Sequence, residues 1–156
     1  MRSRGFMLLV GSLAVLGLAL FPVAVAADKK LEKKDMPAPV LAAFEKAYPS
    51  ATVKGYGKEV EKGKTYYEIE SVDGGRTLDV SYLPDGTVAE IEKGVTEGNL
   101  PAPVKDAVAK KHPDGKIEKA EKTTRGAVVQ YDVKIATGKT KVEMSIDPTG
   151  KVISEK

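Results

Sequence analysis

The sequence contains an internal duplication. Residues 35–92 and residues 99–156 align without a gap when the second segment is moved back by 64 positions. The matching positions are mostly residues that set helix starts, strand cores and turns, such as Pro37 with Pro101, Tyr67 with Tyr131, and Gly86 with Gly150. A single unit of fewer than about 70 residues buries little apolar surface, and pairing of two units eases that shortage. The duplication therefore predicts an architecture, but it indicates no particular activity.

The first 26 residues are typical of a secretory signal peptide. Arg2 and Arg4 give a positive start, residues 6–25 are largely apolar, and Ala24–Ala26 has the A-x-A form of a cleavage site. The alternative is a retained anchor, because the apolar segment is about long enough to span a bilayer. Cleavage near Ala26 predicts a periplasmic or secreted protein that meets the membrane only through the uncleaved signal segment.

Charge and cysteine content narrow the partners that we expect. The chain has 25 basic and 22 acidic residues, and removal of Arg2 and Arg4 with the signal peptide leaves 23 against 22. The charges alternate in sign and form no basic stripe, so we do not expect nucleic acid as a partner. The chain contains no cysteine, so its stability must come from its core and from the pairing of the repeats.

Each repeat predicts one helix that begins at a proline pair. Pro37 and Pro39 suit a first helical turn, whose amides lack intrahelical partners, and Asp35 is a candidate cap. Apolar residues then recur at helical spacing up to Tyr48-Pro49: Val40, Ala43, Phe44 and Ala47.

After the helix the apolar period changes to two, which predicts strands separated by glycine turns at Gly63 and Gly126. We predict an α+β fold, in which a helix followed by a four-stranded antiparallel meander occurs twice. The predicted parts are a signal peptide (1–26), a lysine-rich linker (27–34), repeat 1 (35–94) and repeat 2 (99–156). We expect both helices on one face of a continuous curved sheet, with the other face left to solvent.

Motifs for catalysis or metal binding are incomplete in this chain. His112 is the only histidine and has no cysteine or second histidine with which to build a zinc site. Gly63-Lys64-Thr65 lacks the upstream glycine of a phosphate-binding loop. Glu68 and Glu70, with Asp132 in the second copy, could act as acid and base only if they were buried. We therefore expect no enzyme, no cofactor and no metal, although a buried carboxylate pair in a cleft would support an enzyme.

A recognition surface is the more promising prediction. In the first copy it comprises residues that we expect on the outward face of the sheet: Tyr56, Tyr66, Glu68, Glu70 and Arg76. Tyrosine among charged residues suits binding surfaces, because its rigid ring offers contact area at low entropic cost. In the second copy Gln130 replaces Tyr66 and Lys134 replaces Glu70, so we add these two positions to the predicted site.

Short motifs recur at matching places in both copies. The first copy contains Met36-Pro37-Ala38-Pro39-Val40, Tyr48-Pro49, Tyr67-Glu68-Ile69-Glu70, Asp73-Gly74 and Pro84-Asp85-Gly86. The second contains Leu100-Pro101-Ala102-Pro103-Val104, His112-Pro113, Tyr131-Asp132-Val133-Lys134 and Asp147-Pro148-Thr149-Gly150. In this order the motifs resemble the PepSY-like family, whose tandem members are related to beta-lactamase-inhibitor proteins.

The resemblance implies tandem helix-plus-meander modules that hold a partner protein on an open, concave sheet face. It also implies inhibition or modulation of exported enzymes. The disulfides of the inhibitors have no counterpart here, and no position matches their inhibitory loop, so we carry over neither beta-lactamase inhibition nor any functional residue.

Two functions remain open at this stage. The first is an exported, non-enzymatic binding module that offers the outward sheet face to a protein or peptide. The alternative is a structural or cell-envelope protein that interacts weakly with cell-wall polymer through its lysines. The sequence predicts no oligomeric state.

Overall fold

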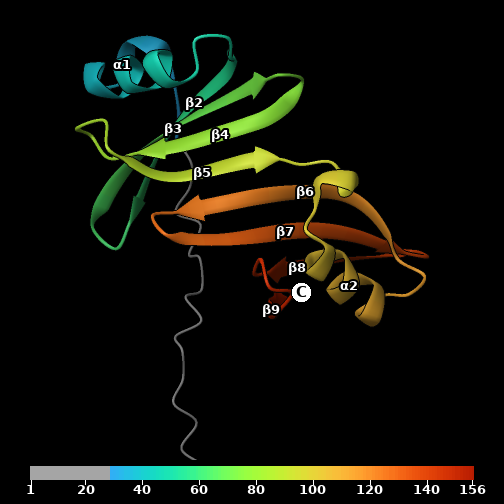
Figure 1. The fold of residues 1–156 in the computed structure, drawn as a ribbon. Helices are drawn as coiled ribbons and strands as arrows, with labels where there is room; N and C mark the ends of the chain where they lie inside the picture. Colours follow the sequence, from blue (N-terminus) through green and yellow to red (C-terminus); the bar gives the residue numbers. More distant parts are fainter. Residues whose placement is uncertain (1–28) are drawn as a thin grey trace, which may run out of the picture.

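A computed structural model describes residues 29–156 as one open sheet of nine antiparallel strands with two helices (Figure 1). The first half contains β1 (Lys29–Leu31), α1 (Ala38–Ala47), β2 (Thr52–Glu61), β3 (Lys64–Asp73), β4 (Arg76–Tyr82) and β5 (Val88–Gly94). The second contains α2 (Ala102–Lys111), β6 (Lys116–Arg125), β7 (Val128–Thr137), β8 (Thr140–Ile146) and β9 (Val152–Glu155). The predicted signal peptide lies outside the described residues. Within residues 29–156, neither helix is long and apolar enough to cross a membrane.

The strands follow one another across the sheet in chain order, from β1 to β9. This confirms the α+β class and places all nine strands in one antiparallel sheet. Short turns connect most neighbours, and glycines with positive φ occupy the turns, among them Gly63 (77°) and Gly126 (58°). Glycine populates this left-handed region without the steric cost that a Cβ would impose.

Each helix packs on its own half of the sheet. In the first half the buried core consists of Met36, Val40, Phe44, Ile69, Leu78, Val80 and Tyr82. In the second half it consists of Leu100, Val104, Val108, Ala120, Val133, Ile135, Met144 and Ile146. The strand register places both sets on the same face. Val80 lies opposite Ile91, and Ile91 lies opposite Thr124. Thr124 is on the same face of β6 as Ala120 of the second core, because the two are separated by an even number of residues along the strand. Residues 29–156 therefore form two cores beneath two helices, and neither helix covers the other face of the sheet.

The starts of the helices differ from the prediction in one respect. Pro37 is the N-cap residue of α1 and no side chain of the described residues caps this helix, so the predicted cap at Asp35 is wrong. Instead, the Asp35 carboxylate accepts a hydrogen bond from the backbone N–H of Glu32 at 3.2 Å. This bond closes a short 3-10 helix at Lys33–Asp35, so Asp35 stabilises the approach to α1 and not α1 itself.

Part of the predicted lysine-rich linker forms a strand. Lys29–Leu31 pairs with β2, with Leu31 opposite Tyr56. With the same offset of 64 residues, Lys29 and Leu31 match Lys93 and Val95, and the backbone N–H of Val95 donates to the carbonyl of Ala120 at 2.9 Å. The pairing of β1 with β2 in the first half therefore corresponds to the pairing of the end of β5 with β6 in the second half. Regular secondary structure begins before residue 35.

Tyr82 is the fully buried aromatic residue of the first core, and its hydroxyl has no hydrogen-bond partner among residues 29–156. Burial raises the pKa of Tyr82 to about 12. An unsatisfied buried hydroxyl costs about 1–3 kcal/mol, so Tyr82→Phe should raise the free energy of unfolding by about 1 kcal/mol. Urea denaturation of both proteins measures this difference, and a less stable variant would show that the hydroxyl makes a bond in solution.

Candidate functional site

We call the sheet face opposite both helices the open face. Its residues alternate with the core residues along each strand, as expected for β-structure. From the first half it includes Gly55, Gly57, Glu59, Glu61, Tyr66, Glu68, Glu70, Thr77, Asp79, Ser81, Glu90 and Glu92. From the second half it includes Lys119, Glu121, Thr123, Arg125, Gln130, Asp132, Lys134, Glu143 and Ser145. The first half of this face is rich in carboxylates, and the second half mixes both signs.

Five of the predicted site residues lie on the open face. Tyr66, Glu68 and Glu70 lie along β3, and Gln130 and Lys134 lie along β7. Four strand spacings separate these two strands in the sheet order, which is about 19 Å. The two groups therefore belong to one surface, although no single small ligand would contact both.

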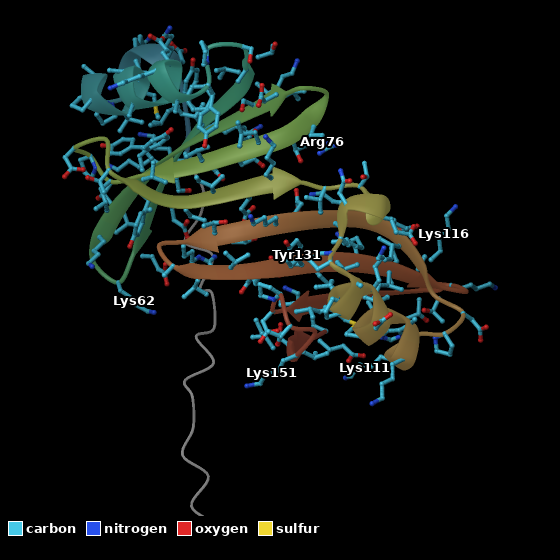
Figure 2. The ribbon with its side chains drawn as sticks, in the orientation of Figure 1. Lys62, Arg76, Lys111, Lys116, Tyr131 and Lys151 are labelled. Carbon is cyan, nitrogen blue, oxygen red and sulfur yellow. The ribbon has the colours of Figure 1, made fainter. Side chains whose placement is uncertain are left out.

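Tyr56 and Arg76 do not lie on the open face. Tyr56 lies opposite Ile69 and packs against the first core, so its predicted outward orientation is wrong. A register shift between Val53 and Gly55 is the cause, because the extra residue of a β-bulge reverses the alternation that follows it. Arg76 is exposed at the β3–β4 turn, opposite Asp73, where Figure 2 shows it at the end of the hairpin.

Two glycines leave room for the carboxylates of β3. Gly55 lies opposite Glu70, and Gly57 lies opposite Glu68. A Cβ on Gly55 would stand 2.8 Å from the Glu70 Oε2 atom, so this side chain lies across β2. At the matching positions the second half has Lys119 in place of Gly55 and Glu121 in place of Gly57. The pair of glycines that leaves room for two carboxylates is therefore a property of the first half alone.

A cluster of acidic side chains lies near the middle of the open face, and the sequence did not predict it. Glu92 on β5 lies opposite Asp79 on β4 and opposite Thr123 on β6. Burial, then a hydrogen bond with Glu90 and the charges of Glu90, Glu121 and Asp132, raise the pKa of Glu92 to about 8. Burial also raises the pKa of Asp79. The Glu92 carboxyl group thus keeps its proton at neutral pH, whereas an isolated glutamate would lose it near pH 4.5.

Asp132 links three strands of the second half. Its carboxylate accepts hydrogen bonds from Thr123 Oγ1 at 2.8 Å, Ser145 Oγ at 2.5 Å and Gln130 Nε2 at 3.0 Å. Thr123 is only 2% exposed, so this bond satisfies a buried hydroxyl. Asp132 therefore ties β6, β7 and β8 together on the open face.

Two hollows of the described part of the chain lie near the candidate residues. One of about 170 Å³ lies on the open face, lined by Glu59, Glu61, Tyr66, Ser81, Ala89, Glu90 and Arg125. The other, of about 320 Å³, lies between α1 and the sheet and includes Phe44, Tyr48 and Tyr56. Among residues 29–156, no three acidic, histidine or cysteine residues are grouped so as to hold a metal ion. His112 instead contacts Glu155, with 3.1 Å between Nε2 and Oε1.

Comparison with protein families identifies the class to which this architecture belongs. The model of the family described as "Putative beta-lactamase-inhibitor-like, PepSY-like" matches residues 25–88 and again residues 65–154. These matches together span most of the chain, so the protein belongs to this PepSY-like family. Among curated proteins, none matches the sequence.

Solved structures share the fold. One, described as a "putative periplasmic" protein from Bacteroides eggerthii, has a TM-score of 0.66 and 22% identity, with 78% of this chain and 88% of that chain covered. A BLIP-like protein from Bacteroides fragilis has a TM-score of 0.59 and 23% identity, with coverage of 76% and 83%. At these identities the similarity concerns the fold alone.

Proposed function

We propose that the protein is an exported, non-enzymatic binding module that holds a protein or peptide on its open face. The observation that carries this proposal is the placement of both helices on the opposite face, so that neither helix covers the continuous surface formed by β2 to β8. The family's inhibitor-like description and the periplasmic description of the Bacteroides eggerthii protein support the mode and the location.

The charges of the open face indicate the chemistry of the partner. Carboxylates dominate the part formed by β2 to β5, where Glu68 and Glu70 lie above the glycines of β2. Complementary charges increase association rates and exclude like-charged surfaces. We therefore propose a partner that presents lysine or arginine to the first half, with Tyr66 as an apolar contact beside them.

In this proposal the duplication serves to widen one surface. The halves correspond element by element, because α1 precedes β2 to β5 just as α2 precedes β6 to β9. Even the register shifts match, since those in β2 at Val53/Gly55 and in β6 at Ile117/Lys119 differ by 64 residues. We infer two copies of one unit whose sheets join edge to edge, which gives a surface wider than one copy provides.

Affinity capture from periplasmic extract tests the proposal. The wild type should retain a partner that the double variant Tyr66→Ala/Glu70→Lys loses. Glu97→Lys provides the matched control, because it reverses an exposed carboxylate outside the open face. Equal recovery by all three proteins would contradict a role for this face. Salt-sensitive sedimentation with purified peptidoglycan in the absence of any partner would favour the cell-envelope alternative.

A further inference from the structure

The two halves meet along a short strand pairing. Only Ile91–Gly94 of β5 is in register with Glu121–Thr124 of β6. By contrast, β2 and β3 pair along their whole lengths, from Thr52 to Glu61 on β2. The hydrophobic cores of the halves are separate, so this pairing, which we call the seam, is the main determinant of how one half is oriented relative to the other.

Like charges lie near each other across the seam on both faces of the sheet. On the helix-covered face, Lys93 lies directly opposite Lys122. On the open face, Glu92 lies directly opposite Thr123, so Glu121 is its diagonal neighbour across the seam, and Glu90 is the next residue of β5 on the same face. The charges of Glu90, Glu121 and Asp132 oppose the ionisation of Glu92. Like charges on neighbouring strands destabilise their pairing, so the charges near the seam work against closure of the sheet.

Specific polar contacts hold the seam closed. The Arg125 guanidinium on β6 binds both carboxylate oxygens of Glu90 on β5, with 3.0 Å between Nη2 and Oε1. At the other end, Thr77 reaches over Gly94 to Glu121, with 3.5 Å between Oγ1 and Oε1. A Cβ on Gly94 would stand 2.6 Å from the Thr77 Oγ1 atom, so the glycine permits this crossing.

Glu92 faces charged or titratable groups from every strand around it. These groups are Asp79 from β4, Glu90 from β5, Lys119, Glu121 and Arg125 from β6, and Asp132 from β7. Lys119 is engaged by Glu121 at 2.8 Å, and Arg125 by Glu90. Neither cation is therefore positioned as a dedicated partner for an ionised Glu92.

We propose that Glu92 is a pH-responsive latch between the two halves. In this proposal the neutral carboxyl can donate a hydrogen bond to Glu90, whose carboxylate Arg125 binds, and the β5–β6 pairing stays intact. The ionised carboxylate loses this bond and adds a charge beside Glu121 and Asp132, which loosens the β5–β6 pairing and lets the halves change their relative orientation. The latch is independent of the proposed binding function, because it concerns the shape of the sheet and not its partner.

The direction of the response follows from the titration of Glu92. Its pKa in the folded protein is about 8, above the ordinary value of 4.5. Between pH 4.5 and about pH 8, the folded protein therefore keeps a proton on Glu92 that the unfolded chain has released. The contribution of this group to stability therefore falls as the pH rises from about 4.5 to about 8, and the seam should open above pH 8.

Distance measurements between two spin labels test the latch. Lys46 and Lys110 are exposed, occupy equivalent positions on α1 and α2, and can be replaced by cysteine without interference, because the chain has no other cysteine. In the protein purified after export, the distance distribution should be narrow at pH 6. It should broaden or shift above pH 8, with a midpoint that coincides with the Glu92 carboxyl titration followed by NMR.

Two variants and one control make the test specific. Glu92→Gln mimics the neutral carboxyl and should keep the narrow distribution at pH 9, whereas Glu121→Gln removes a neighbouring charge and should lower the midpoint pH. Glu143→Gln, on the open face of β8, should behave as the wild type. An unchanged wild-type distribution across the titration of Glu92, titration of Glu92 near pH 4.5, or a Glu92→Gln variant that still responds to pH would each overturn the proposal.

Discussion

Replacing Gly86 or Gly150 with alanine should lower the free energy of unfolding by about 3 kcal/mol. Both glycines have positive φ, 86° and 90°, which costs a residue with a Cβ about 1–2 kcal/mol. The new Cβ would also stand 2.7 Å from the Pro39 carbonyl oxygen or 2.6 Å from that of Pro103. These carbonyls belong to the first turns of α1 and α2, so relief requires movement of a helix away from its core, at a cost typical of overpacking.

Two other glycines make it possible to measure the cost of positive φ without the cost of the steric clash. Gly74 and Gly138 have positive φ, 56° and 61°, but a Cβ on either would meet no atom within 4 Å. Their alanine variants should therefore lose only about 1 kcal/mol. Urea denaturation of all four variants gives the comparison. Equal losses at Gly86 and Gly74 would show that contact between the turn and the helix is unimportant.

Reversing two charges on the open face should weaken partner binding by about 10- to 100-fold. Glu68→Lys/Glu70→Lys places positive charge where we propose that the partner presents its own, and juxtaposed like charges are strongly unfavourable at interfaces. Much of the loss should come from slower association, because long-range attraction guides encounter. Surface plasmon resonance with the captured partner measures both rate constants.

Salt and a matched variant serve as controls for this prediction. Raising the ionic strength should weaken binding by the wild type much more than binding by the double variant, since salt screens exposed charges. Glu45→Lys/Glu97→Lys changes the net charge equally but outside the open face, and it should bind nearly as well as the wild type. Equal losses in the two double variants would indicate a nonspecific charge effect.

Much of the fold follows from local patterns in the sequence. Proline pairs, helical spacing and glycine turns predict α1 and the hairpins, because each signal concerns neighbouring residues. Strand β1 was not predicted, because the signal for it is not local. Lys29–Leu31 has only three residues and a lysine-rich composition, and its pairing with Tyr56–Lys58 depends on chain far away in the sequence. Only the equivalence of Lys29 with Lys93 could have indicated it.

The candidate site shows where the two-residue alternation of side chains along a strand predicts their orientation and where it does not. Alternation places Tyr66, Glu68 and Glu70 correctly, because β3 pairs without a register shift. It fails for Tyr56, since a bulge lies between this residue and Val53. It could not identify Glu92 either, because the groups that raise its pKa include Glu121 and Asp132 of the other half. Their proximity depends on the pairing of β5 with β6, which no local pattern encodes.

Photo-crosslinking in the intact cell envelope tests the central claim, binding through the open face, most directly. A photoreactive phenylalanine analogue would replace Tyr66 or Gln130 on the open face, and Lys46 or Lys110 on the helices. We predict one common adduct from the open-face positions and none from the helix positions. Adducts from the helix positions alone, or equal adducts from all four, would contradict a partner-binding role for the open face.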